Sequence, residues 1–319
     1  MKQLLKSQMM IKIVCIIFLF IPNVVFAQKF TIPVLPDTQN NTYQKRGVLF
    51  TQIEWIETNV DSLKTPIVLH VGDVVQTNDF AEWELASVGM AILDRANIPY
   101  AIAVGNHDTG LYRKIGETQI APGDKNINLR DTQKFNYFFP VNRFSLQKGW
   151  FEENKSDNAY YIFEAGGLQW IVIVLEFSAR ESAAQWMDET LKKFPDHNAI
   201  ILTHRHLSPE GEIRPDNYGF GDMSAIDIFD KYIKTHKNVL MVLSGHTWYT
   251  AWRTDKGNNG NTIYQILQDY QTDTNNGYIR LLDIDVKNKT IVAKIYSPVT
   301  NVTLDDESKI TFTDVQFIR

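Results

Sequence analysis

Five short polar segments, each placed directly after an apolar run, limit most strongly what this chain can fold into. The apolar runs, at 31–35, 67–71, 100–104, 199–202 and 239–243, have the length and the β-branched content of buried strands. The polar segments that follow them are Asp37-Thr38-Gln39, Gly72-Asp73-Val74-Val75-Gln76, Gly105-Asn106-His107-Asp108, Thr203-His204 and Gly245-His246-Thr247-Trp248. In open α/β sheets ligands collect beyond the carboxyl ends of the strands. Carboxylate, amide and imidazole groups that arrive there together therefore predict a metal site.

The order of the elements predicts the fold class. Between the strands, apolar residues recur at helical spacing at 52–63, 81–96 and 183–194. From about residue 250 the pattern changes to strands separated by Asn-Gly and Lys-Asn-Lys turn signals, at 262–267, 278–285, 291–296 and 310–318. We therefore expect an α/β (α+β) fold, a two-sheet β-sandwich flanked by helices, with a β-rich C-terminal part.

The first 27 residues read as a secretory signal peptide. Three lysines form a basic front, residues 13–21 form an apolar stretch, and Val25-Phe26-Ala27 is a small-residue cleavage pattern. The apolar stretch is well short of the ~20 residues that span a bilayer, which disfavours a membrane anchor. The only cysteine, Cys15, lies inside this leader, so the mature chain would have neither disulfides nor thiolate metal ligands. We expect a secreted or periplasmic protein.

The charge balance excludes some partners. The formal net charge is -5, and it becomes more negative by three when the lysine-bearing leader is removed. An acidic chain of this kind argues against a nucleic-acid surface or an anionic-membrane surface.

Residues 109–158 interrupt the alternation of strands and helices. This segment is long, polar and irregular, yet it is rich in aromatic residues, among them Tyr112, Phe135, Phe139, Phe144 and Trp150. A long insertion in a compact domain is typical of a lid or a binding loop. The aromatic residues are equally compatible with a satellite core, and the sequence leaves both interpretations open.

The ordered set of strand-end motifs resembles the calcineurin-like metallophosphoesterases, from about Phe30 to Trp248. Two later segments, Leu267-Gln268-Asp269-Tyr270-Gln271 and Tyr296-Ser297-Pro298, look like the tail of secreted bacterial members. The resemblance implies that 28–319 is one metallophosphoesterase domain of the sandwich fold. It also implies hydrolysis of a small phosphorylated substrate, a monoester or a diester, by a metal-activated hydroxide. Two divalent cations, drawn from Mn, Fe, Zn or Mg, are the expected cofactors.

The resemblance assigns the ligands of one metal position completely. Asp73 matches the aspartate that bridges both cations in the family. The ligands that match the family at this position are Asp73, Asn106, His204 and His246.

The other metal position departs from the family pattern. Asp37 matches, but Gln39 stands where the family has a histidine, and Trp248 stands where it has a second one. Indole has no lone pair for a cation, whereas Gln39 offers a carbonyl oxygen. Gln76 is a further candidate, because it falls where the purple acid phosphatase branch has a tyrosine ligand. A position built only from oxygen ligands suits Mn or Mg better than Zn.

Other polar residues in the motifs have expected roles in catalysis or binding. In the family the histidine at the place of His107 faces the substrate, and the acid that follows, here Asp108, orients it and favours the imidazolium, which can protonate a leaving alkoxide. Arg205 and His206 are candidates for phosphate contact or for a missing ligand. His70, inside an apolar run, fits a core position or a position that supports a ligand better than a ligand position.

The departures at Gln39 and Trp248 leave a second function open. A secreted binding protein that kept the phosphoesterase scaffold and one metal would also explain the loss of two histidines. Metal content and turnover separate the two functions.

Overall fold

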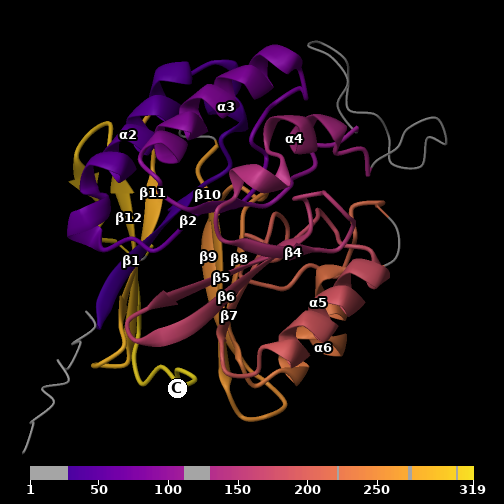
Figure 1. Ribbon diagram of the computed structural model, residues 1–319. Coiled ribbons are helices and arrows are strands. Elements are labelled where there is room, and N and C mark those ends of the chain that lie inside the picture. The colour runs from indigo at the N-terminus through magenta and orange to yellow at the C-terminus, as the bar shows by residue number, and fades with distance from the viewer. Residues whose placement is uncertain (1–27, 111–129, 221–222, 272–274, 307) are drawn as a thin grey trace, which may run out of the picture.

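Two packed β-sheets with helices on their outer faces make up the structure, a computed structural model that describes residues 28–110, 130–220, 223–271, 275–306 and 308–319 (Figure 1). Each sheet has seven strands. Helices α2 (Arg46–Leu63) and α3 (Phe80–Arg95) lie on one side of the sandwich, and α5 (Glu181–Lys193) and α6 (Ala225–Lys231) lie on the other. The predicted two-sheet fold with a β-rich C-terminal part is confirmed.

The first sheet combines strands from the two ends of the described chain. Its order is β13-β12-β11-β1-β2-β3, with β14 paired to β12. Strands β1, β2 and β3 are parallel, whereas β11 joins β1 in antiparallel register. The bounds are β1 Lys29–Leu35, β2 Val68–His70, β3 Tyr100–Ile102, β11 Ile279–Asp285, β12 Thr290–Ser297, β13 Val302–Thr303 and β14 Ile310–Phe312.

The second sheet carries four adjacent parallel strands, β6, β7, β8 and β10, within the order β4-β5-β6-β7-β8-β10-β9. Its bounds are β4 Gln147–Trp150, β5 Ala159–Ala165, β6 Leu168–Leu175, β7 Asn198–Thr203, β8 Val239–Ser244, β9 Tyr249–Lys256 and β10 Thr262–Asp269. The carboxyl ends of β1 to β3 in one sheet and of β7, β8 and β10 in the other supply the loops that form the site described below.

Strand β6 shows how the sequence builds two cores. Alternate side chains of a strand point to opposite faces of its sheet. Val172 and Val174 belong to the core between the two sheets, and Ile171 and Ile173 belong to the core between the second sheet and helices α5 and α6. Because both faces are covered, the strand reads as a continuous apolar run.

The short helices and turns lie mainly in the loops at the strand ends. They are α1 Gln39–Tyr43, α4 Gln133–Phe138, the 3-10 turn η1 Val141–Arg143 and the 3-10 turn η2 Ile233–Thr235. Helix α2 begins six residues before the predicted 52–63, because Leu49 continues the buried stripe that Ile53 and Ile56 form.

The aromatic segment 109–158 is partly folded. Its described residues form α4, η1 and β4. Phe135, Phe139 and Phe144 are buried in the larger hydrophobic core, and the ring centroids of the first two lie 6.1 and 6.2 Å from that of Trp83 of α3. These rings pack as core residues. Tyr112 and the leader 1–27 lie outside the described residues. Within the described part of the chain, no helix has both the length and the apolar character needed to cross a bilayer.

Candidate metal centre

Three of the predicted ligands meet at the edge where the carboxyl ends of the strands converge. Asp73 follows β2, His204 follows β7 and His246 follows β8, so both sheets contribute. One ligand atom from each residue lies within 4.8 Å of the others. A carboxylate and two imidazoles at this spacing suit a divalent transition-metal ion.

Hydrogen bonds fix the orientation of His204. Its Nδ1 lies 2.8 Å from the carbonyl oxygen of Val71. Because a carbonyl oxygen only accepts, Nδ1 carries the proton, and Nε2 is the nitrogen that lies 2.9 Å from Asp73 Oδ2. A metal-binding histidine commonly donates its second ring nitrogen to a carbonyl in this way. The ring of Phe177 packs against both His204 and His246, at 5.8 and 5.1 Å between centroids.

Asp73 is held as a carboxylate despite its burial. Burial favours the neutral acid, but the neighbouring imidazoles of His204 and His107 outweigh it and lower the pKa of Asp73 to about 2. The backbone N–H of His107 also donates to Asp73 Oδ1, at 2.8 Å. A fully buried charge of this kind is suited to a cation ligand.

The backbone around the centre adopts conformations that few side chains tolerate. Asp73 and His246 have φ angles of 51° and 73°, in the left-handed region that favours glycine. Gly105 lets the loop after β3 approach Asp73, because a Cβ at residue 105 would lie 2.0 Å from Asp73 Oδ1. The loops are therefore shaped around the Asp73 carboxylate.

Two neutral oxygens also fit a cation. Asn106 Oδ1 and Gln39 Oε1 are both buried, and each is without a hydrogen-bond partner in the described part of the chain. A buried carbonyl oxygen with no donor is costly, and a divalent cation would satisfy it. The residues at this edge therefore fit the divalent metal that the sequence predicts.

Asp37 and Gln39 lie together after β1, at the second predicted metal position. Gln39 donates to Asp37 through its backbone N–H at 3.1 Å and through Nε2 at 3.3 Å. Burial and the negative charges of Asp269 and Asp73 raise the pKa of Asp37 well above its ordinary value. Trp248, which replaces a family histidine, is 56% exposed.

Asp108, predicted to orient His107, bonds the backbone around the centre. Its two carboxylate oxygens accept backbone N–H groups of Val74, Val75 and Gly105, at 2.9, 3.2 and 2.9 Å. The Asp108 side chain thus connects the loop after β2 to the loop after β3. The carbonyl oxygen of Gln76 lies 2.6 Å from Nδ1 of His107 and helps to orient this ring.

The remaining candidates divide between the centre and its surroundings. Arg205 lies beside the centre and donates to the backbone and side chain of Asp216, both at 2.7 Å. His206 does not reach the centre, because its Nε2 bonds Gln265 Oε1 of β10 at 2.6 Å. Gln76 Oε1 is buried and is without a partner among the described residues, so it stays a candidate.

His70 supports the ligand loops. Its Nδ1 accepts the N–H of Gly72 at 3.1 Å, and its Nε2 therefore donates to Thr38 Oγ1 at 2.9 Å. Burial and the nearby His204 lower the pKa of His70 to about 3, which keeps the ring neutral. The histidine thus links the Asp37 loop to the Asp73 loop, in line with the supporting position expected for it.

A cleft of about 380 Å³ opens over the centre. Ligand candidates line its floor, and arginine and aromatic side chains line its rim; its residues are Gln39, Asp73, Asn106, His107, Arg205, Pro209, Arg214, Tyr218, His246, Thr247, Trp248, Tyr249 and Gln271. The sequence prediction missed Asp269 and Gln271, at and just after the end of β10. The strand-end rule that identified the other ligands, applied to 262–267, would have indicated them.

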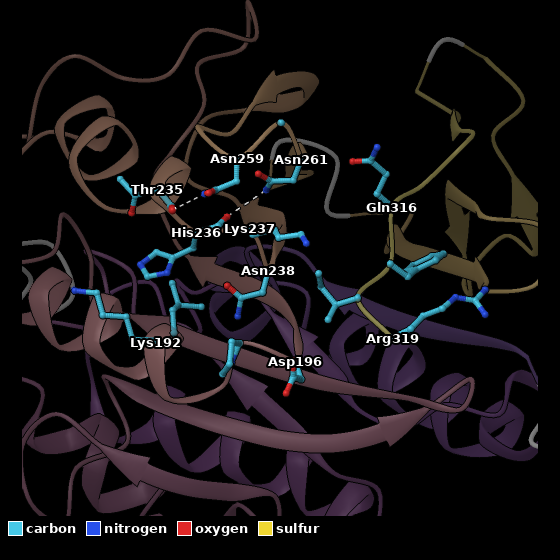
Figure 2. A pocket seen from close by; sticks show the side chains of 15 residues that line it. Lys192, Asp196, Thr235, His236, Lys237, Asn238, Asn259, Asn261, Gln316 and Arg319 are labelled. Atoms are coloured by element: carbon cyan, nitrogen blue, oxygen red, sulfur yellow. Dashed lines mark hydrogen bonds between the residues drawn. The ribbon is translucent and has the colours of Figure 1, made fainter.

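A larger cavity, of about 930 Å³, lies at the opposite edge of the second sheet (Figure 2). Asn238 and Asn261, just before β8 and β10, line it, and Asn261 donates to the carbonyl oxygen of His236 at 3.2 Å. This is the amino end of the parallel strands. None of the predicted site residues lines this cavity, and ligands in α/β sheets bind at the carboxyl end. Its greater volume therefore does not make it the active-site cleft.

Comparisons with solved structures agree with this fold. Among solved structures, a dimetal phosphatase from Danio rerio aligns with a TM-score of 0.53 and 13% identity, over 89% of this chain and 98% of that one. A purple acid phosphatase from yellow lupin aligns with a TM-score of 0.56 and 13% identity, over 89% of this chain and 54% of that one. Likeness at this identity shows the fold alone.

Two sequence matches go further. The uncharacterized protein YvnB of Bacillus subtilis (strain 168) is 29% identical over 279 residues, which are 84% of this chain; the chain spans only 20% of YvnB. A family model described as calcineurin-like phosphoesterase matches residues 30–248, which is more than half of the chain and includes all of the strand-end motifs. The chain therefore belongs to the calcineurin-like phosphoesterase family.

Proposed function

We propose that this protein is a metal-dependent hydrolase of a small phosphorylated substrate. The observation that carries the proposal is the group of Asp73, His204 and His246, whose ligand atoms lie within 4.8 Å of one another. Asp73 and His246 line a cleft that His107 also lines, and His204 is buried behind them. Family membership and the dimetal phosphatase fold support the same chemistry.

The ligands described above would hold the cations. Asp73, Asn106, His204 and His246 would hold one ion, and Asp37 and Gln39 would contribute to the other. When bound, the ions supply a water nucleophile of lowered pKa and neutralise the charge on the phosphoryl group.

His107 is the proton donor in this proposal. Gln76 accepts from its Nδ1, so the ring keeps one proton there and can carry a second on Nε2. An imidazolium fixed in this way can protonate the departing alkoxide. Its backbone N–H binds Asp73, which couples the position of the ring to the position of the ligand.

Side chains at the rim suit the rest of the substrate. Arg205 and Arg214 line the cleft, and the Nε of each is buried and has no partner among the described residues. Guanidinium groups match the geometry of phosphate oxygens. Trp248 and Tyr249 are 56% and 65% exposed and offer aromatic surface to the alcohol portion of the ester.

The Asp73→Asn substitution tests the proposal. The variant should fold normally, because apolar strands build the sheets, but it should lose metal-dependent phosphate release almost completely. Release of phosphate from one monoester and one diester is measured with Mn, Zn, Fe and Mg, beside circular dichroism and metal content. Asp283→Asn, on β11, is the matched control and should behave as wild type. Full activity in a folded Asp73→Asn protein would rule out this centre.

The same measurements address the alternative of a single-metal binding protein. Its support is the replacement of two family histidines by Gln39 and Trp248. One tightly held equivalent without turnover of any ester would favour it, whereas two equivalents with turnover favour the hydrolase.

We also propose export, on the strength of the leader pattern in residues 1–27. Mass spectrometry of the protein from its producing cells tests this, since cleavage would leave a chain that begins at Gln28.

A further inference from the structure

We propose that Asp269, at the end of β10, is a ligand of the second metal position and takes the place that Trp248 cannot fill. The inference rests on the proposed metal-dependent function and concerns a residue beyond the segment that matches the family model, which ends at residue 248.

The sheet register places Asp269 close to Trp248, the residue that replaces a family histidine. Strands β9 and β10 are antiparallel, and Asp269 lies directly opposite Tyr249, the residue after Trp248. Strand β10 is also parallel to β8, so both strands end at the edge where His246 emerges. Asp269 is fully buried there, whereas Trp248 is 56% exposed.

A chain of contacts connects Asp269 with Asp37. The carboxylate of Asp269 accepts the backbone N–H of Gln271 at 2.9 Å and its side-chain Nε2 at 2.8 Å. The side-chain oxygen of Gln271 accepts from Nε2 of Gln39, and the same nitrogen lies 3.3 Å from Asp37 Oδ2. The four side chains therefore belong to one contiguous group.

Asp73 is paired with His204, but Asp37 and Asp269 have no Lys or Arg ion-pair partner in the described part of the chain. Asp37, Asp73 and Asp269 are at most 2% exposed. Gathering buried carboxylates is costly unless a positive charge joins them. Independently, Gln39 is 3% exposed, its amide lies between Asp37 and Gln271, and its Oε1 has no partner among the described residues.

The donor atoms indicate which ion this position would take. Carboxylates of Asp37, Asp73 and Asp269 and amide oxygens of Gln39 and Gln271 are all hard oxygen ligands. Oxygen-only sets suit Mn²⁺ or Mg²⁺, whereas the imidazoles of His204 and His246 also suit Zn²⁺ or Fe. The centre would thus have two positions of different chemical preference.

The test is titration of Mn²⁺ into chelator-treated protein, followed by calorimetry and by electron paramagnetic resonance. Wild type should bind two equivalents. Asp269→Asn should bind the second roughly 10- to 100-fold more weakly. Asp283→Asn, an aspartate of β11 outside the cleft, should match wild type. If Asp269→Asn binds each of the two equivalents with the same affinity as wild type does, the assignment is overturned.

The melting temperature separates a ligand from a structural residue. In metal-free protein Asp269→Asn should melt no lower than wild type, because a buried acid without a Lys or Arg partner is removed, while its stabilisation by Mn²⁺ should be smaller. A lower metal-free melting temperature with an unchanged Mn²⁺ response would mean that Asp269 is structural only.

Asp269→His gives a second variant should Asp269→Asn fail to fold. An imidazole at this place should move the preference of the second equivalent from Mn²⁺ towards Zn²⁺, and an unchanged preference would overturn the assignment. Phosphate release in the same samples keeps the two proposals distinct. Two bound equivalents without hydrolysis of any ester contradict the proposed function only; hydrolysis by an Asp269→Asn protein that keeps both equivalents contradicts the ligand assignment only.

Discussion

At the scale of single residues, neighbouring acids and histidines in this chain have different duties that their spacing does not reveal. His107 and Asp108 are adjacent, yet the ring of His107 lines the cleft and the carboxylate of Asp108 binds backbone N–H groups of two loops. His204 and His206 are separated by one residue, yet the first lies beside Asp73 and the second is bonded to Gln265. Proximity in sequence therefore predicts neither a shared role nor, for His206, a place in the site.

The role of His107 as proton donor leads to a kinetic prediction. His107→Ala should keep its metal ions and lose roughly 10²- to 10⁴-fold in turnover of alkyl phosphates. Turnover of nitrophenyl phosphate should fall less, because nitrophenolate leaves without a proton. Rates for both esters, with metal content, measure this. An equal fall for the two esters would show that His107 does not protonate the leaving group.

At the scale of elements, close approach between loops shapes the centre, and Gly105 tests it. A Cβ at residue 105 would lie 2.0 Å from Asp73 Oδ1 and 2.5 Å from its backbone nitrogen, so Gly105→Ala must displace the Asp73 loop. We expect a loss of roughly 1–3 kcal/mol in the free energy of unfolding and a smaller stabilisation by metal. Urea unfolding with and without Mn²⁺ measures both quantities.

Gly47, in α2, provides the matched control. A Cβ there meets no atom within 4 Å, and alanine favours helices, so Gly47→Ala should leave the metal response unchanged. Similar losses in the two alanine variants would contradict a specific constraint at Gly105.

The loop after β6 holds the ring that packs against both metal-site histidines. Arg130 donates to the carbonyl oxygens of Phe177 and Ser178, at 2.7 and 2.8 Å. Glu176 forms ion pairs with Arg180 and Arg130, at 2.9 and 3.4 Å. These contacts position Phe177 against His204 and His246.

Glu176 gives this loop a pH dependence. Burial alone would raise the pKa of Glu176, but the hydrogen bonds from Arg180 and the charge of Arg130 hold it below its ordinary value of 4.5. The folded state then binds fewer protons than the unfolded state. The stabilisation is complete above the ordinary pKa and is lost as the pH falls through the lower, folded value.

Glu176→Gln should reduce the free energy of unfolding by roughly 1.5–3 kcal/mol near neutral pH. Between about pH 5 and about pH 3 the variant should lose less stability than wild type, because its side chain takes up no proton. Urea unfolding across this range measures the effect, with the exposed Glu164→Gln as control. Parallel curves for wild type and Glu176→Gln would exclude the ion pairs as the cause.

At the scale of the whole molecule, strand patterns predicted the architecture because parallel strands covered on both faces must be apolar throughout. The rule that ligands collect beyond the carboxyl ends of strands predicted Asp73, His204 and His246 at one edge. It did not assign Asp108, whose partners depend on how two loops pass each other, or Asp269, whose place depends on the β9–β10 register. The sequence pattern did not predict short strands such as β13, or the hairpin of β5 and β6, as separate elements.

The part of the chain after residue 248 enters the interior of both sheets. Strand β10 lies between β8 and β9, and β11 lies between β1 and β12. A fragment that stopped at the boundary of the family match would leave β8 and β1 each without one of its two neighbours, and it would lack Asp269. Exchange of the later strands for those of a relative would therefore change the packing of both sheets and replace Asp269, the proposed ligand, in the same step.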